Sequence, residues 1–392
     1  MSAAELLVPA DPSPAAVSIV PVTSRAELVR FIELPARLHA QDPNWIKPLR
    51  MERLEALSPK KNPYFQHAEA AFWLAVRDGR DVGRISAQID RLSLETRKDA
   101  TGHFGMIAAE DDGDVFKALF DTAEAWLRAR GMRRVTGPFN LSINEETGLL
   151  VDGFDTPPML MMPHDLPHVG RRVEERGYAK AKDTFAYLYD IDVDMSRGVQ
   201  ALLKRKRGDN VTLRHLSFKR YAQDIRDLTA IFNEAWTDNW GFVPLTEAET
   251  AHMAKALRPL IHEKLVWFVD VDGEPAAFGV CVPNLNEAIR DLDGSLFPFG
   301  WAKLLWRLRM RNGVKTGRVP LMGVRRKYAG TWLGSVMPFM VVDAMRRNAR
   351  DHGLKTMELG WILEDNMPMR AMLDSINSRP YKTQRVYVKD LA

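Results

Sequence analysis

The chain has 392 residues, of which 46% are hydrophobic and 27% charged, and its formal net charge is +4. These values are typical of a globular protein of two domains. The single cysteine, Cys281, excludes an intramolecular disulfide and a cysteine-based zinc site. The sequence contains no run of about 18 apolar residues, so we expect no transmembrane helix and a location in the reducing cytoplasm.

The N-terminal segment, residues 1–20, is rich in Ala, Pro and Ser. It has neither a basic start nor a long apolar core. This composition predicts a disordered leader and argues against a signal peptide.

Two β-hairpins of the same design are predicted, one in each half of the chain. Residues 71–90 contain two alternating apolar runs joined by a DG turn, and residues 265–282 have the same pattern. A tryptophan precedes each turn glycine by six residues, as the sequence shows at Trp73 and Trp267. The matched spacing indicates an internal duplication.

An amphipathic helix is predicted after each hairpin. Residues 114–131 end at Gly131 and residues 336–353 end at Gly353, each glycine serving as a helix stop. An asparagine follows each glycine after thirteen residues. Each copy reads as helix, hairpin, strand, helix, strand, helix and terminal strand. The pattern predicts an α/β (α+β) protein of two tandem domains, each a mixed, mostly antiparallel sheet covered by helices.

The repeat suggests a division of the chain. We place an N-terminal domain at residues 21–195, a basic linker at 196–212 and a C-terminal domain at 213–392. The second copy is longer, and its surplus falls in a stretch from Gly294 to Val342 without Asp or Glu. We therefore predict a basic amphipathic insertion at about 290–320, whose field attracts anions.

The stretch from residue 323 to residue 373 resembles the GNAT acyltransferase fold. It reads as that family's strand, pyrophosphate loop, helix and next strand. In the family, backbone N–H groups of the loop and the helix N-terminus hold the CoA pyrophosphate. The resemblance implies that acyl-CoA contacts a set of residues in this half, although helix capping is an equal alternative for the last of them: Arg325, Arg326, Gly330, Gly334 and Asn366. The corresponding loop of the first copy is acidic from Glu110 to Asp114 and would repel a pyrophosphate.

From about Pro21 onward the chain is also similar to a bacterial family of tandem GNAT-like proteins. The segments that carry this resemblance include DPNWIKPL, KKNPYFQHAE, GPFNLSINEETGLLVDGFDTPPMLMMPH and NEAWTDNWGFVPLT. The family includes the bacterial ceramide synthases. The resemblance implies an N-acyltransferase that moves a long-chain fatty acyl group from acyl-CoA to the amine of a sphingoid base. It further implies acyl-CoA as co-substrate, no metal, and a cytoplasmic enzyme held peripherally at the inner membrane.

N-acylation needs a group that takes a proton from the attacking amine. The densest polar stretch, residues 138–165, follows a predicted strand and lies among apolar residues. Its candidate catalytic residues are Glu145, Glu146 and His164, and its candidate substrate-binding residues are Asn140 and Asn144. A structural hydrogen bond is the alternative role for His164.

Residues 297–311 predict a second functional feature, an amphipathic helix with an apolar face and a basic face. Such a helix is typical of contact with an anionic membrane, and a helix that packs between domains is the alternative. The expected membrane contacts are Trp301, Leu305, Trp306, Arg307 and Arg311.

Two other functions are compatible with the sequence. Some tandem GNAT-like transferases use aminoacyl-tRNA, and the basic run at residues 204–207 would suit a nucleic acid. Because the aromatic residues of 297–311 are segregated from the charges, we favour lipid and expect no specific nucleic acid partner. The second alternative is a non-catalytic lipid-binding module.

Overall fold

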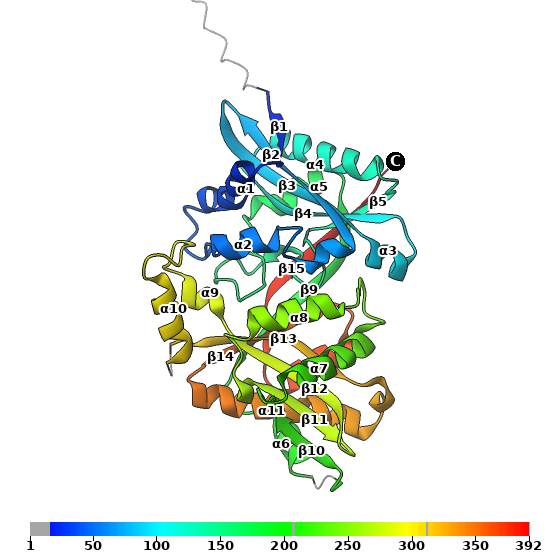
Figure 1. The fold of residues 1–392 in the computed structure, drawn as a ribbon. Helices are drawn as coiled ribbons and strands as arrows, with labels where there is room; N and C mark the ends of the chain where they lie inside the picture. Colours follow the sequence, from blue (N-terminus) through cyan, green and yellow to red (C-terminus); the bar gives the residue numbers. More distant parts are fainter. Residues whose placement is uncertain (1–15, 206–207, 311–312, 392) are drawn as a thin grey trace, which may run out of the picture.

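The computed structural model describes residues 16–205, 208–310 and 313–391, and within these ranges one sheet of thirteen strands runs through both halves of the chain (Figure 1). The first half contributes β1 (Ser18–Pro21), β2 (Ala68–Arg77), β3 (Arg80–Asp90), β4 (Thr101–Ala109), β5 (Arg134–Gly137), β8 (Leu149–Asp152) and β9 (Ala179–Asp190). The second half contributes β10 (Val211–His215), β11 (Val266–Val271), β12 (Glu274–Pro283), β13 (Thr316–Val324), β14 (Thr356–Leu363) and β15 (Arg379–Asp390). A separate two-stranded ribbon joins β6 (Phe139–Asn140) to β7 (Glu146–Thr147).

The strand order is symmetric about the middle of the sheet, because corresponding strands of the two halves occupy matching positions. It runs β1-β2-β3-β4-β5-β15-β9-β14-β13-β12-β11-β10, with β8 beside β15. All neighbours are antiparallel except β4 with β5 and β13 with β14, which occupy matching places in the two halves. The order agrees with the predicted duplication, and the mixed, mostly antiparallel sheet is confirmed.

The two halves exchange their last strands at the middle of the sheet. β15 pairs with β5 of the first half, with Tyr387 opposite Gly137, and β9 pairs with β14 of the second half, with Tyr189 opposite Met357. β15 and β9 also pair with each other. Neither half therefore completes its sheet with its own strand, and the segments on either side of residues 196–212 are interleaved.

Helices cover both faces of the sheet. In the first half, α1 (Arg25–Leu38) and α2 (Arg50–Ala56) lie on one face, and α4 (Gly113–Arg128) and α5 (His168–Glu175) lie on the other. In the second half, α7 (Tyr221–Trp236) and α8 (Glu247–Leu257) lie opposite α6 (Arg197–Lys204) and α11 (Trp332–His352). Shorter helices are α3 (Arg91–Arg97), α9 (Leu285–Ile289), α10 (Gly300–Arg309) and α12 (Met367–Ser375).

Local sequence explains the matched hairpins. In the β2–β3 turn, Asp78 has φ 51° and Gly79 has φ 72°, and in the β11–β12 turn, Asp272 and Gly273 have φ 53° and 80°. Two consecutive left-handed residues form the turn that suits the twist of a hairpin, and Asp-Gly adopts it readily. Both predicted hairpins are confirmed.

Two predicted segments differ in detail from the structure. Residues 1–15 of the predicted leader lie outside the described residues, while Ser18 to Pro21 pair with β2 as an edge strand. The stretch predicted as a basic linker contains α6, whose Val199 is buried in the core of the second half. Arg205 follows that helix, and residues 206 and 207 of the basic run lie outside the described part of the chain.

Candidate active site

A bulge in β4 opens the sheet of the first half. The pairing of β3 with β4 shifts between Arg84 and Ser86, so that Met106 and Ile107 together face a single residue of β3. Met106 takes a left-handed conformation with φ 49°. Bulges of this kind often lie beside active sites, because they redirect backbone and side chains away from the regular ladder.

The segment after β5 crosses this bulge. A Cβ atom added to Gly105 would lie 1.8 Å from the carbonyl oxygen of Phe139, so only glycine allows the chain to cross here. Asn140 then accepts a hydrogen bond from the Met106 backbone N–H at 2.8 Å and donates one to Glu146 Oε2 at 2.7 Å. Two of the residues predicted for the site, Asn140 and Glu146, are thus held at the bulge.

Two arginines face a group of carboxylates here. Arg53 of α2 binds Glu52 at 2.6 Å and lies 3.8 Å from Glu146. Arg84 of β3 donates to the Phe31 carbonyl oxygen at 2.7 Å. Burial raises the pKa of Glu145 to about 8, with Arg53 opposing the shift, and burial raises the pKa of Asp165 to about 7.

His164 forms a pair with an aspartate from the first part of the chain. Its Nε2 atom lies 2.8 Å from Asp42 Oδ2, and its side chain is 1% exposed. His39 lies on the other side of Asp42, with its Nδ1 atom 3.7 Å from Oδ2, and stacks on Trp45. Burial lowers the pKa of His164 below its ordinary value, and burial lowers the pKa of His39 to about 4.

The protonation of this pair follows from its partners. Although burial raises the pKa of Asp42, hydrogen bonds from the Asn44 backbone N–H and from His164 lower it overall, so the carboxylate is ionised. An ionised carboxylate can only accept, which assigns the imidazole proton to Nε2. Nδ1 of His164 has no hydrogen-bond partner within the described residues. A neutral imidazole with a free Nδ1 lone pair is the form that a general base requires.

These groups surround a cavity of about 140 Å³, which we call the central cavity. Its walls come from α1, α2, β4 and the loop before α5, and Asn286 reaches it from the second half. The polar part of the lining consists of His39, Arg53, Arg84, Asn140, Glu146, His164, Asp165 and Asn286. Of the residues predicted from the 138–165 stretch, Asn140, Glu146 and His164 line the cavity. Glu145 and Asn144 do not.

The chain is 55% identical over 384 residues to the bacterial ceramide synthase of Caulobacter vibrioides (strain NA1000 / CB15N), a match that covers 98% of this chain and 100% of that protein. The chain belongs to the bacterial ceramide synthase family of tandem GNAT proteins. As a member of this family it is an enzyme, an N-acyltransferase.

Two further comparisons agree with this assignment. Protein YghO of Escherichia coli (strain K12) is 46% identical over 369 residues, which is 94% of each chain. The solved structure of a tandem GNAT protein from the clavulanic acid biosynthesis pathway superimposes with a TM-score of 0.56 at 13% identity. The superposition covers 96% of this chain and 99% of the solved structure's chain, and it confirms the tandem GNAT fold. No protein-family model matches the chain.

In the second half, two tryptophans pack near the end of β13. The register of the parallel pairs equates Met106 and Ile107 with Leu321 and Met322, whereas the bulge of β13 lies two residues earlier, where Val319 and Pro320 together face Cys281 of β12. There the Trp236 indole N–H donates to the Met322 carbonyl oxygen at 3.1 Å, and the Trp236 ring packs on that of Trp361. Leu321 packs in the same apolar cluster as Trp236.

Four of the five residues predicted for CoA lie between β13 and the first turn of α11, and the fifth, Asn366, precedes α12. Arg325 binds Glu234 at 2.8 Å and the Pro275 carbonyl oxygen, while Arg326 pairs with Asp238. The Gly334 backbone N–H donates to the Thr331 hydroxyl, which caps α11, and Asn366 caps α12 in the same way. None of the five lines the central cavity. The acids of the corresponding loop in the first half are also paired: Glu110 with Arg37 and Arg80, Asp111 with Arg171 and Arg172, and Asp112 with Arg77.

The predicted membrane helix corresponds to α10. Trp301 and Trp306 are 53% and 61% exposed, and Leu305 is exposed beside them. Leu304, which precedes Leu305, packs against the core of the second half. Arg307 turns inward and binds both oxygens of Asp291 and the Ala288 carbonyl oxygen, while Arg311 lies outside the described residues.

Sequence reasoning missed six members of the site, namely His39, Asp42, Arg53, Arg84, Asp165 and Asn286. Asp165 directly follows His164, and Arg84 interrupts an apolar strand, so both carried a local signal. Nothing local marked the others. Within the described ranges no group of three or more His, Cys, Asp or Glu is arranged to hold a metal ion. None of the described helices has the length and hydropathy needed to cross a bilayer.

Proposed function

We propose that this enzyme moves a long-chain fatty acyl group from acyl-CoA to the amine of a sphingoid base and forms a ceramide-type amide. The observation that carries the proposal is the pair of Asp42 and His164 at the central cavity, which provides a neutral base of assigned tautomer. The 55% identity over nearly the whole of both chains to a protein named bacterial ceramide synthase supports the choice of substrates.

The reaction can be written with the groups at the cavity. The neutral amine attacks the thioester carbonyl carbon, and Nδ1 of His164 takes the proton that the nitrogen loses as the N–C bond forms. The C–S bond then breaks, and the imidazolium returns that proton to the departing CoA thiolate. Asp42 stabilises the imidazolium between these two events. The products are the amide and free CoA.

Negative charge develops on the thioester oxygen during attack and needs donors that are already in place. Arg84 and Arg53 line the cavity and supply positive charge there. Arg84 has an unpartnered Nε atom among the described residues, so one of its donors is available. Glu146, held by Asn140, is placed to accept from the amine or a neighbouring hydroxyl of the acceptor.

We assign the reaction to the first half, because the Asp42–His164 pair and Glu146 lie at its bulge and central cavity. CoA recognition by Gly330, Gly334, Arg325, Arg326 and Asn366 stays a prediction. The pairs of the two arginines with Glu234 and Asp238 would have to open for a pyrophosphate to bind. The exposed aromatic side chains of α10 support work at a membrane surface, and we expect a cytoplasmic enzyme held peripherally at the inner membrane.

The first experiment is a product assay. Purified full-length protein is incubated with a long-chain acyl-CoA and either sphinganine or 3-oxosphinganine, and the N-acyl product and free CoA are quantified by mass spectrometry. We expect both products from the natural protein and from His252→Gln, a control on α8 outside the cavity, and strong loss in His164→Gln. Absence of product with either base would overturn the proposal.

The same assay with charged tRNA tests the aminoacyl-tRNA alternative. Transfer from aminoacyl-tRNA without CoA-dependent product would establish it. The remaining alternative, a non-catalytic lipid-binding module, is inconsistent with membership of an enzyme family at 55% identity.

A further inference from the structure

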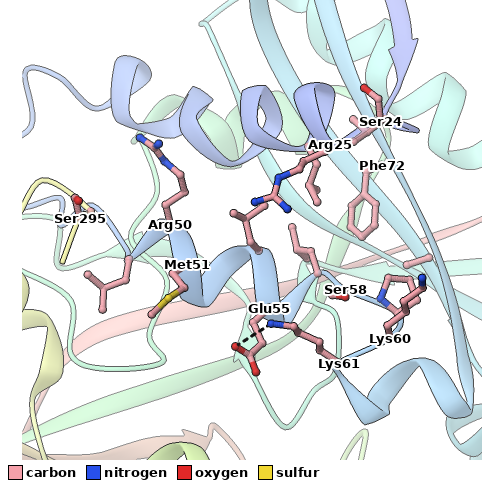
Figure 2. A pocket seen from close by; sticks show the side chains of 18 of the residues that line it. Ser24, Arg25, Arg50, Met51, Glu55, Ser58, Lys60, Lys61, Phe72 and Ser295 are labelled. Carbon is pink, nitrogen blue, oxygen red and sulfur yellow. Dashed lines mark ion pairs between the residues drawn. The ribbon is translucent and has the colours of Figure 1, made fainter. Parts of the chain in front are cut away.

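A second and larger hollow lies beside the central cavity and plays no part in the chemistry above. It is a groove of about 1000 Å³ between α1, α2 and β2 of the first half and residues 294–297 of the second (Figure 2). The α2 helix forms the wall between the two hollows, since Met51, Leu54 and Glu55 line the groove and Arg53 lines the cavity. We call this hollow the groove.

The floor of the groove is apolar. Its aliphatic and aromatic side chains come from four segments that are far apart in the sequence: Leu28, Leu49, Leu54, Leu57, Phe72 and Leu296. Most of these side chains are partly exposed and so remain accessible from the groove. An apolar surface of this extent favours an aliphatic chain over water.

The rim of the groove is basic. Figure 2 shows Arg25 extending from the beginning of α1, Arg50 from α2, and Lys60 and Lys61 from the segment that follows α2. Among the lining residues the one acid is Glu55, which is 3.8 Å from Lys61, and Arg50 binds Glu33 of α1 at 2.5 Å. Arg25 and Lys60 have no ion-pair partner within the described part of the chain and are exposed. The groove therefore carries a surplus of positive charge above an apolar floor.

The groove continues into exposed aromatic residues of the second half. Phe297 lines the groove and is 76% exposed, and Phe299 follows it with 79%. Trp301 and Trp306 of α10 extend the same segment. We call these four residues the aromatic ridge. Lys303 and Arg307 of α10 both bind Asp291, which neutralises part of the positive charge beside the ridge.

We propose that the groove binds an anionic phospholipid of the membrane on which the enzyme works. The lipid phosphate lies near Arg25, Lys60 and Lys61, one acyl chain lies on the apolar floor, and the aromatic ridge enters the bilayer beside it. A basic rim suits the lipid phosphate, an apolar floor suits an acyl chain, and exposed aromatic side chains suit the interfacial zone of an anionic leaflet. The site rests on the proposed function only in that the enzyme works at a membrane.

The position of α2 favours a phospholipid over the acyl-CoA donor. A bound acyl-CoA must present its thioester to the central cavity, and α2 lies between the groove and that cavity, with Leu57 lining both. A phospholipid has no such requirement. It only needs a groove that opens toward the same surface as the aromatic ridge, as Phe297 shows.

Vesicle binding of the full-length protein tests the site without any substrate. We expect co-sedimentation with phosphatidylcholine vesicles that contain phosphatidylglycerol, and weak binding to phosphatidylcholine alone. The double variant Arg25→Gln/Lys60→Gln should lower the partition coefficient about 25-fold, because each basic side chain near an anionic surface contributes roughly a factor of five. The matched control Arg133→Gln/Lys219→Gln removes two exposed cations elsewhere and should change it less than about threefold.

A measurement specific to the acyl chain distinguishes binding in the groove from general attraction to surface charge. A phosphatidylglycerol with a photoactivatable group in one acyl chain should label peptides from residues 49–61 and 68–77, as read by mass spectrometry. Labelling only by the matching long-chain acyl-CoA probe would overturn the proposal, as would equal losses in the two double variants. If vesicle binding behaves as expected and no variant or natural protein forms amide, the proposed function fails and the phospholipid site stands.

Discussion

Asp42 and His164 are 122 residues apart in the sequence, yet His164 Nε2 lies 2.8 Å from Asp42 Oδ2. Asp42 lies just beyond α1, and His164 lies in the loop before α5. The pair exists only because both segments are folded over the bulge of β4, where they line the same cavity as Glu146. This juxtaposition turns a buried histidine into a base with an oriented ring and a defined proton.

Asp42→Asn should therefore impair catalysis far more than folding. The amide can donate as well as accept, so it no longer dictates which nitrogen of His164 carries the proton, and it no longer stabilises the imidazolium. We expect kcat to fall about 100-fold to 10,000-fold, the range associated with general base catalysis, with KM for acyl-CoA nearly unchanged. Steady-state kinetics by thiol release would measure both constants. A kcat within about threefold of the natural enzyme would remove Asp42 from the mechanism.

The pH profile offers an independent view of the same pair. A general base works only when it is unprotonated, and burial lowers the pKa of His164 below its ordinary value. We expect kcat/KM to be constant near neutral pH and to fall on an acid limb below about pH 6.5, the ordinary histidine value. Because Asp42 raises the pKa of His164, Asp42→Asn should move this limb to still lower pH. A limb above pH 7 that is indifferent to Asp42 would indicate a different base.

Much of the fold could be predicted from local sequence patterns. The two DG turns, the glycine stops and the apolar periodicities each act within about twenty residues, so the hairpins and the long helices α4 and α11 could be predicted. The exchange of β15 and β9 could not be predicted in this way, because strand pairing across the middle of the sheet depends on contacts between the ends of the two halves.

The residues of the candidate site also fall into those that local sequence indicates and those that only the fold brings together. His164 could be predicted as a site residue because it is a polar residue in an apolar loop. Asp42 and Arg53 could not, because they acquire their roles only from segments that fold over them. Arg307 shows the same dependence on the fold. Helical periodicity places it on the basic face of α10, but its ion pair with Asp291, sixteen residues away, could not be predicted from that periodicity.

His67 links the two halves through a pair of carboxylates and should make stability sensitive to alkaline pH. Its Nδ1 atom lies 2.9 Å from Asp90 of the first half, and its Nε2 atom lies 3.2 Å from Glu249 of α8. Although burial lowers the pKa of His67, the hydrogen bonds to Asp90 and Glu249 raise it to about 9. The folded pKa exceeds the unfolded value, so this stabilisation is complete below about pH 6.5 and is lost as the pH rises through 9.

The shift corresponds to about 3 kcal/mol of folding free energy. Urea unfolding of the natural protein and of His67→Gln, each at pH 6 and pH 10, should show the natural protein losing about 3 kcal/mol more than the variant between the two values. Glu249→Gln, which can keep the N-terminal cap of α8, should show a smaller loss. Parallel losses in all three proteins would mean that His67 is not charged in the folded state.

Gly105 is the position where the fold of the site tolerates least change. A methyl group there would lie 1.8 Å from the Phe139 carbonyl oxygen, which belongs to the backbone and cannot move without displacing Asn140 and the bulge. We expect Gly105→Ala to lower the free energy of unfolding by more than about 3 kcal/mol and to abolish acyl transfer, since overpacking against backbone is among the severest core changes.

The matched control is Gly198→Ala in α6, where an added Cβ meets no atom within 4 Å. There the substitution should stabilise the protein by about 0.5–1 kcal/mol, because alanine favours a helix. Urea unfolding and the product assay on both variants check the pair. Equal stability of the two would show that the chain does not cross β4 as closely as this geometry requires.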